Sequence, residues 1–265
     1  VAGRNGTGTA TVTLAQSTGS GTDSESAESD PLLDASNSAV KDPTKSPTLA
    51  VPTVPSLDRL LGSNVVVVAK TNATVDDGNA VRDLRVVAGG NATLNTGVAG
   101  RDILLLGGAN AASAISLTAG DDVTVVAQGG DATVTLAKAT GAGTDSESAD
   151  VDPLLDASSG TVNDPTNATQ TIKGLLSSNI VVAAQNNASV TGGTPLIASA
   201  DAYRDLKVVA GTTATLRFGQ AGRDLTLLAG GNADSAFKLI AGDDVGVVAG
   251  RNGTGTATVT LAQST

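Results

Sequence analysis

The sequence predicts an all-β fold, a parallel β-helix or β-solenoid with coils of about 19–20 residues and two loop insertions rich in Ser, Asp and Pro. The prediction depends on a short motif that recurs at nearly constant spacing and on the apolar alternation that follows it. The motif is a pair of polar residues. In the first half of the chain it occurs at Ser63-Asn64, Arg82-Asp83, Arg101-Asp102 and Asp121-Asp122. The steps of 19, 19 and 20 positions are too short for a helical hairpin and match one coil of a β-helix.

The second half of the chain repeats the motif with one irregular step. There the pairs begin at Ser178, Arg204, Arg223 and Asp243, at steps of 26, 19 and 20 positions. The residues one and three places after each pair are aliphatic in every coil, beginning with Val65 and Val67, and polar residues such as Lys207 lie between them in several coils. Alternation with a period of two predicts a β-strand whose apolar side faces inward.

Two longer duplications organise the chain. Residues 1–18 are identical to residues 248–265, at a shift of 247 positions. A looser duplication at a shift of 122 positions pairs GTDSES at 21–26 with 143–148, and DPLLDAS at 30–36 with 152–158. We therefore expect the two ends to be copies of one place in a longer periodic protein, or parts of a fibre subunit whose end continues into the start of the next.

These repeats predict the domain organisation. Residues 1–18 are the end of a coil that continues from a preceding repeat, and residues 19–62 form the first insertion loop. Residues 63–140 are solenoid coils, 141–177 are the second insertion loop, and 178–265 are again solenoid coils.

The composition favours a thin core. Only one Tyr and two Phe are present among 265 residues, with no Cys, Met, Trp or His and with 32 Gly, so the core consists of small side chains. Such cores suit architectures in which each layer contacts only its neighbours. A net charge of −10 argues against nucleic acid, and no apolar run is long enough to span a bilayer. We expect an extracellular or cell-surface protein whose main partner is itself.

A column of asparagines marks one corner of the predicted coil. Eight residues after the second residue of each pair come Asn72, Asn91, Asn110, Asn187, Asn232 and Asn252, with Gly130 and Thr213 as exceptions. Asparagine suits a turn because its side chain bonds the local backbone, and stacked asparagines form hydrogen-bonded ladders. A second short β-segment should follow, as at residues 92–94 and 133–136, before a Gly-rich turn leads to the next coil.

Carboxylates are the candidate cation ligands. Stacking of the coils would place Asp83, Asp102 and Asp122 one strand spacing apart, and likewise Asp205, Asp224 and Asp244. Backbone N–H groups and neighbouring arginines would offset their repulsion, with pairing to Asp121 or Asp243 one coil on, or calcium would lie between the rungs. The acidic loop residues that would offer oxygen ligands to calcium include Asp23, Glu25, Asp145 and Glu147, although a solvated acidic loop is the favoured explanation for them.

An apolar column raises the question of lateral contacts. The fourth residue after each pair is Val68, Val87, Leu106, Val126, Val209, Leu228 or Val248, with Ala183 as the exception. Strict alternation would point this column outward. Either the strand bends and turns it inward, or a hydrophobic stripe buries against a parallel chain.

The strings AGRDILLLGGANA at residue 99 and AGRDLTLLAGGNA at residue 221 resemble the 19-residue repeats of filamentous-haemagglutinin-like proteins, which are bacterial surface adhesins. The resemblance covers about eight coils and leaves out both insertions. It implies a right-handed parallel β-helix and a role in surface adhesion. Right-handed connections between parallel strands are also expected on steric grounds.

Catalysis is not expected, because His and Cys are absent and the carboxylates repeat with the coil as structural residues do. We predict a structural repeat unit of a long extracellular bacterial fibre. The alternative is the stalk of a large adhesin whose binding tip lies outside this sequence.

Overall fold

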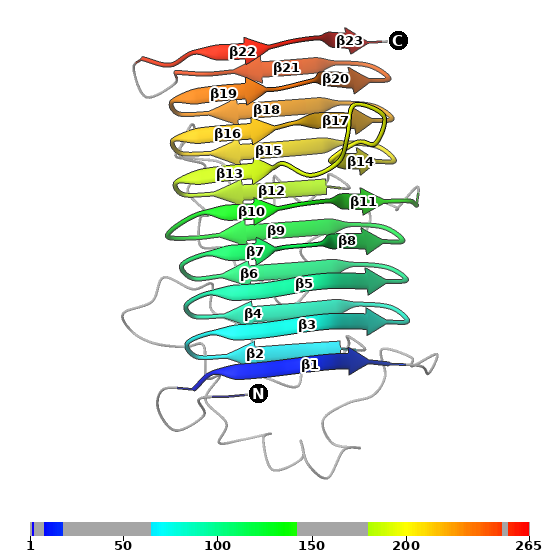
Figure 1. Ribbon diagram of the computed structural model, residues 1–265, viewed down its shortest axis with the longest axis vertical. Coiled ribbons are helices and arrows are strands. Elements are labelled where there is room, and N and C mark those ends of the chain that lie inside the picture. Colours follow the sequence, from blue (N-terminus) through cyan, green and yellow to red (C-terminus); the bar gives the residue numbers. More distant parts are fainter. Residues whose placement is uncertain (1, 3–7, 18–64, 142–179, 251–253, 265) are drawn as a thin grey trace.

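The computed structural model describes residue 2 and residues 8–17, 65–141, 180–250 and 254–264. Throughout these residues the chain is all-β, without a helix, and its strands form one sheet of eight strands and one of fifteen (Figure 1). Every named pair of neighbouring strands is parallel; the pairings recorded run from β1 with β3 to β20 with β23. The predicted all-β class with parallel strands is therefore confirmed.

The eight-stranded sheet consists of the predicted strands that follow each polar pair. They are β2 (Val65–Ala69), β4 (Leu84–Ala88), β6 (Ile103–Gly107), β9 (Val123–Ala127), β12 (Ile180–Ala184), β15 (Leu206–Ala210), β18 (Leu225–Ala229) and β21 (Val245–Val248). They stack in chain order. Their first, third and fifth residues belong to the buried core over most of the sheet, as the alternation predicts.

The fifteen-stranded sheet is larger than expected. Its first strands are single, β1 (Ala10–Gln16), β3 (Ala73–Ala80) and β5 (Ala92–Ala99). Each later coil adds two shorter strands, and these are β7 (Ala111–Ser113), β8 (Ser116–Ala119), β10 (Ala132–Val134), β11 (Ala137–Ala139), β13 (Asn187–Val190), β14 (Ala200–Ala202), β16 (Thr213–Leu216), β17 (Phe218–Ala221), β19 (Asn232–Ser235), β20 (Lys238–Ala241), β22 (Ala257–Val259) and β23 (Ala262–Ser264). The short second segment was predicted, whereas its continuation along β8, β11, β14, β17, β20 and β23 was missed.

The chain passes from one sheet to the other in each turn, which is consistent with a β-solenoid (Figure 1). The long intervening segments do not interrupt the stack, because β12 pairs directly with β9 and β3 pairs directly with β1. Apart from Gly141, the predicted insertions 19–62 and 141–177 lie outside the described residues. Eight coils therefore lie between the equivalent ends of the chain.

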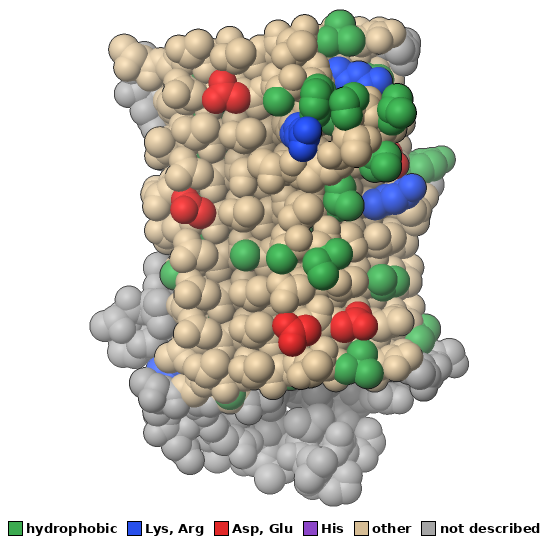
Figure 2. Space-filling view, viewed as in Figure 1, with side chains coloured by type: hydrophobic (Ala, Val, Ile, Leu, Met, Phe, Trp, Pro, Cys, Tyr) green, Lys and Arg blue, Asp and Glu red, His purple; other side chains and the backbone are tan. Residues whose placement is uncertain are grey.

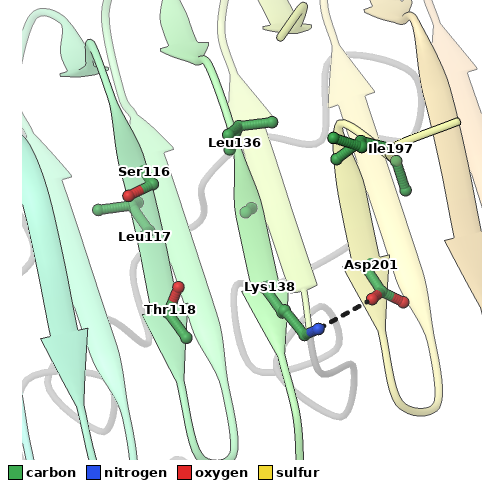
Figure 3. A pocket seen from close by; sticks show the side chains of 9 residues that line it. Ser116, Leu117, Thr118, Leu136, Lys138, Ile197 and Asp201 are labelled. Carbon is green, nitrogen blue, oxygen red and sulfur yellow. Dashed lines mark ion pairs between the residues drawn. The ribbon is translucent and has the colours of Figure 1, made fainter. Parts of the chain in front are cut away.

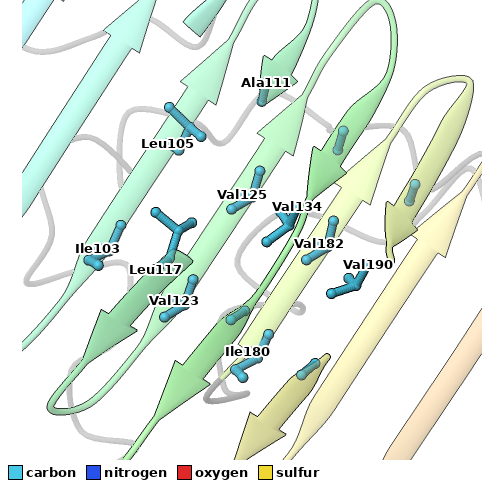
Figure 4. Close-up of a cluster of buried hydrophobic side chains, with 14 of the residues drawn as sticks. Ile103, Leu105, Ala111, Leu117, Val123, Val125, Val134, Ile180, Val182 and Val190 are labelled. Carbon is cyan, nitrogen blue, oxygen red and sulfur yellow. The ribbon is translucent and has the colours of Figure 1, made fainter. Parts of the chain in front are cut away.

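The core is a thin layer of aliphatic side chains between the two sheets (Figure 4). Leu105 and Val125 from the eight-stranded sheet lie in the same cluster as Leu117 and Val134 from the other. At one edge of this layer, nine alanines stand in a single column, and they are Ala10, Ala73, Ala92, Ala111, Ala132, Ala188, Ala214, Ala233 and Ala257. Small side chains at this position let the two sheets approach each other at the corner.

The outer face of the eight-stranded sheet is largely buried within the single chain. Val68, Val87, Leu106, Val126 and Val209 are at most 2% exposed, yet none belongs to the interior cluster. The side chains at these five positions are thus buried outside the interior cluster, and their contact with a parallel chain stays a prediction. Leu228 is half-buried and Val248 is 40% exposed.

Lys207 occupies the same outer face, between Val181 of β12 and Thr226 of β18. Burial lowers the pKa of Lys207, and the charge of Arg223 acts in the same direction, while Asp205 and Asp224 oppose the change. The charged amine is therefore less favourable in the folded chain than in water.

We predict that Lys207→Met raises the melting temperature at neutral pH, because it removes a partly desolvated charge and keeps the aliphatic stem. Since the pKa is lowered on folding, the wild-type chain should gain stability as the pH rises through the folded-state pKa, and the variant should lack this gain. Thermal unfolding between pH 7 and 10 measures both effects. Lys138→Met, at an exposed lysine, is the control, and equal shifts in the two variants would contradict the prediction.

Candidate functional site

The asparagine column forms a hydrogen-bonded ladder along one corner of the stack. The Asn110 side-chain amide donates to Asn91 Oδ1 at 2.9 Å, and the backbone N–H of Asn91 donates to Asn72 Oδ1 at 2.9 Å. Further along, the backbone N–H and the side-chain amide of Asn187 both donate to Asp131 Oδ1 at 3.0 Å. Each rung thus caps the turn of the neighbouring coil.

Two positions of this column differ from the prediction. Asp131 occupies the place assigned to Gly130, because that coil carries one additional residue before β10; its N–H donates to Asn110 Oδ1 at 2.9 Å. Thr256 occupies the place assigned to Asn252, since its N–H donates to Asn232 Oδ1 at 3.0 Å. Asn252 itself lies outside the described residues. The longer turn before β22 includes Gly250 with φ of 75°, a conformation that glycine adopts without strain.

The aspartate column lies at the corner that enters the eight-stranded sheet. Asp224 donates its backbone N–H to Asp205 Oδ1 at 3.2 Å, and Asp244 donates its own to Asp224 Oδ1 at 3.3 Å. Asp122 donates to Asp102 Oδ1 in the same way, at 3.3 Å. The column therefore caps turns through backbone N–H groups, which is one of the two expected explanations for it.

Arginines neutralise the two most buried members of the column. Arg101 binds Asp83 through two parallel bonds, Nε to Oδ1 at 2.7 Å and Nη2 to Oδ2 at 2.5 Å, and Asp83 has no exposed surface. Arg223 binds Asp205 with the same two-point geometry. Each arginine therefore reaches back one coil, to the aspartate of the preceding pair. Paired carboxylate and guanidinium groups form the strongest class of side-chain hydrogen bonds.

Calcium between the rungs of these columns stays a prediction. Among the described residues, no three acidic side chains come together in a group that could hold a metal ion. Asp83, Asp102, Asp122, Asp205, Asp224 and Asp244 stand in single file along the corner, with an arginine partner for the first member of each trio. The loop acids Asp23, Glu25, Asp145 and Glu147 lie outside the described residues.

One groove breaks the regularity of the fifteen-stranded sheet (Figure 3). It has a volume of about 190 Å³ and is lined by residues of β8, β11 and β14, by the residue before β11 and by the loop before β14: Ser116, Leu117, Thr118, Leu136, Ala137, Lys138, Ile197, Ala198 and Asp201. Lys138 Nζ lies 3.5 Å from Asp201 Oδ2 across its floor. Residues 191–199 form the wall, a turn closed by backbone hydrogen bonds between Thr194 and Ile197.

This groove was not predicted, although the sequence contains a signal for it. The step of 26 positions between Ser178 and Arg204 exceeds the two steps that follow it, of 19 and 20 positions, by six or seven residues, and these additional residues build the wall. Gly193, with φ of 76°, lets the chain leave the sheet there, since a Cβ at this place would meet Ile197 O at 2.3 Å.

No protein-family model matches the chain, and neither a characterised protein nor a solved structure is significantly similar to it. The described part of the chain also contains no helix that is long and apolar enough to cross a membrane. The function is therefore inferred from the 247-residue repeat and from the residues exposed on the sheets.

We predict that Asp83→Ala lowers the free energy of unfolding by about 3 kcal/mol, because the substitution leaves the Arg101 guanidinium without its buried partner. Denaturant unfolding followed by circular dichroism measures the change. The exposed Asp77 of β3 provides the matched control, and Asp77→Ala should change stability by less than about 0.5 kcal/mol. Equal effects of the two substitutions would contradict a structural role for the Asp83 pair.

We predict that Asn110→Ala costs about 1–2 kcal/mol, since it removes one bond to Asn91 Oδ1 and one from the Asp131 N–H. Asn79→Ala, at an exposed asparagine of β3 outside the ladder, is the control and should be close to neutral. A loss confined to Asn110→Ala supports the ladder, whereas two neutral variants would show that it contributes nothing to stability.

Proposed function

We propose that this chain is a structural repeat unit of a long extracellular bacterial fibre and that it has no catalytic role. The proposal includes a right-handed solenoid, which the steric preference of parallel crossovers favours. The resemblance of its coils to filamentous-haemagglutinin-like repeats supports a place at the cell surface.

One observation carries the proposal. When strand partners are followed from coil to coil, each column of partners leads from a residue of the first copy to the equivalent residue of the second copy. The alanine column runs from Ala10 through seven intermediate alanines to Ala257, which is the residue 247 positions later and the copy of Ala10. A second column runs from Ala15, paired with Gly78, to its copy Ala262, paired with Leu239. In each of the two columns, a residue and its copy 247 positions later are therefore separated by the same eight coils.

This return of the columns to equivalent residues bears on how one repeat joins the next. Residues 10–16 show how this sequence pairs with the coil that follows, and residues 257–264 show how the same sequence pairs with the coil that precedes. The first copy forms one continuous strand and the second is divided between β22 and β23, yet both copies place their alanines in the same two columns. One copy of the segment can therefore pair with a coil on either side. The repeat can thus continue without a shift of register or a change of fold, as a fibre requires.

The exposed chemistry agrees with a passive shaft. The outward residues of the fifteen-stranded sheet include a column that is mostly hydroxyl-bearing, and its members are Thr11, Thr74, Thr93, Ala112, Thr133, Ser189, Thr215, Asp234 and Thr258. Its members repeat with the coils, as structural residues do. Hydroxyl groups donate and accept hydrogen bonds with water, so such a face stays hydrated.

Fibre diffraction and electron microscopy of the protein on its native surface test the proposal. Eight coils at about 4.8 Å each predict an axial repeat of about 38 Å together with a strong reflection at about 4.8 Å. Long filaments with this repeat would support the fibre. Short rods of fixed length that end in a distinct head would instead identify the stalk of an adhesin and overturn the proposal.

A further inference from the structure

Ala2 is bonded to the outer side of β2, the first strand of the eight-stranded sheet. Its backbone N–H donates to Val68 O at 2.8 Å, and its carbonyl accepts a bond from the Lys70 N–H at 3.1 Å. Ala2 therefore pairs with Ala69 in parallel, as a residue of one more coil would. Within the described part of the chain, Ala2 is the only residue that pairs with this side of β2.

The column of partners that contains Ala2 also leads to the copy of Ala2. After Ala69, its members are the fifth residues of the next strands: Ala88, Gly107, Ala127, Ala184, Ala210 and Ala229. Ala249 directly follows β21 and continues this column, since the residue before it pairs with Leu228. Ala249 is the copy of Ala2 at a shift of 247 positions. The strand that leads into this alanine in the repeat is β21, so the sequence of β21 is the one expected beside β2.

The backbones of these two end strands have matching bonding groups. In β2, the Val65 N–H bonds toward β4, so the N–H and C=O of Val66 point to the opposite side of the strand. In β21, the Asp244 carbonyl accepts a bond from the Leu225 N–H of β18, so the N–H and C=O of Val247 point away from β18. With β21 beside β2 in the register of the alanine pair, the Val247 N–H would donate to Val66 O.

The core is less completely covered at these two strands than between them. Val86, in the middle of a central strand, has no exposed surface, whereas Val65 and Val67 of β2 are 8% and 7% exposed. At the other end of the stack, Val245 and Val247 of β21 are only half-buried, although they pack against the same cluster. Contact between the two ends would bury these side chains, and burial of apolar surface stabilises an association.

The strands at the two ends carry no charge that would oppose such a contact. β2 and β21 contain only Val, Gly and Ala, and β1, β22 and β23 contain only uncharged residues. Figure 2 shows a mostly uncharged surface at the upper end of the stack, where β22 and β23 lie. Although the net charge of the chain is −10, the contact would bring no charged strand residues together, and salt screens the more distant charges.

We propose that β21 of one molecule pairs in parallel with the outer side of β2 of a second molecule, with Val247 opposite Val67. The strands that follow, β22 and β23, then take the place of β1 against β3 of the second molecule. This exchange offers β3 the same sequence that β1 offers it, and it adds the pairing of β21 with β2. A molecule cannot make this contact with itself, because β18 holds β21 seven strand positions from β2, about 34 Å away. The inference rests on the proposed function and names the segment that joins one unit to the next.

A disulfide tests the pairing, because the chain has no cysteine of its own. One full-length pool carries Gly246→Cys, and a second pool, differing in tag mass, carries Val66→Cys. The proposed register places these residues opposite each other at about 4.8 Å, which is within the range of a disulfide. A Cβ at Gly246 would lie 3.9 Å from Leu225 O, an ordinary contact, so the substitution fits the fold. The matched control replaces it by Thr226→Cys, which is the partner of Gly246 in β18 and would lie about 9.6 Å from Val66.

The yield of heterodimers under mild oxidation decides the pairing. A yield with Gly246→Cys that exceeds the Thr226→Cys control about tenfold supports the proposal. Equal yields from the two cysteine positions overturn it. Equal yields are also the result expected if another segment of the same chain fills this side of β2, so the same measurement decides against a second molecule in that case.

The exchange of β1 has its own matched pair of variants. Val12 and Val259 occupy the same position in the two identical segments, and both pack partly buried against the core. Val12→Asp in the pool with Val66→Cys weakens the hold of β1 on its own molecule, so it should raise the heterodimer yield about threefold. Val259→Asp in the pool with Gly246→Cys weakens the incoming segment and should lower the yield by a similar factor. Since a general loss of stability moves both yields in one direction, changes of the same sign, or no change in either, overturn the exchange.

The pairing of separate molecules and the proposed function can fail independently. Fibres with an axial repeat of about 38 Å, together with no specific heterodimer, would overturn the pairing and keep the fibre. Specific heterodimers of the purified chain, together with no such fibre on the native surface, would keep the pairing and overturn the fibre.

Discussion

The structure depends on backbone hydrogen bonds between successive coils in one unbroken register. Each coil supplies its N–H and C=O groups to the coil before and the coil after, so no coil is stable without its neighbours. The register is kept by columns of like residues, because alanine stacks on alanine at the corner of the core and asparagine bonds asparagine at the turn. Where a carboxylate column accompanies this stack, backbone N–H groups and two-point arginine bonds offset the repulsion that stacking creates.

The strands of the eight-stranded sheet could be predicted because large aliphatic side chains alternate with other residues directly after a recognisable pair. The outer half of the fifteen-stranded sheet could not, since its strands are marked by Ala119, Ala139 and Gly97, which carry no alternation of size. Small residues there are a requirement of packing: a Cβ at Gly97 would lie 2.8 Å from Leu94 Cδ2. The position four places after the pair was predicted to point outward or to bend inward, and the structure shows it buried without joining the interior cluster.

Prediction of the site succeeded where the chemistry repeats and failed where it does not. Asn91, Asn110 and Asp205 were identified because each occupies a fixed place in the coil, and their partners follow from the stack. Thr256 was missed because a longer turn displaced the column by four residues. The groove was missed because its lining comes from three successive coils, and only the register shows that Thr118, Lys138 and Asp201 are neighbours.

The direct pairing of β9 with β12 has a consequence for how the chain folds. On either side of this junction, strand partners in the eight-stranded sheet come from consecutive coils that are close in sequence, whereas Val123 and Ile180 are separated by the whole of the second long segment. Closing this longer loop costs about 1 kcal/mol more in chain entropy than closing the loop of an ordinary coil. The sheet is continuous in space, but the pairing of β9 with β12 should form more slowly than the pairings on either side of it. We therefore expect the four coils before this junction and the four coils after it to fold as two cooperative units.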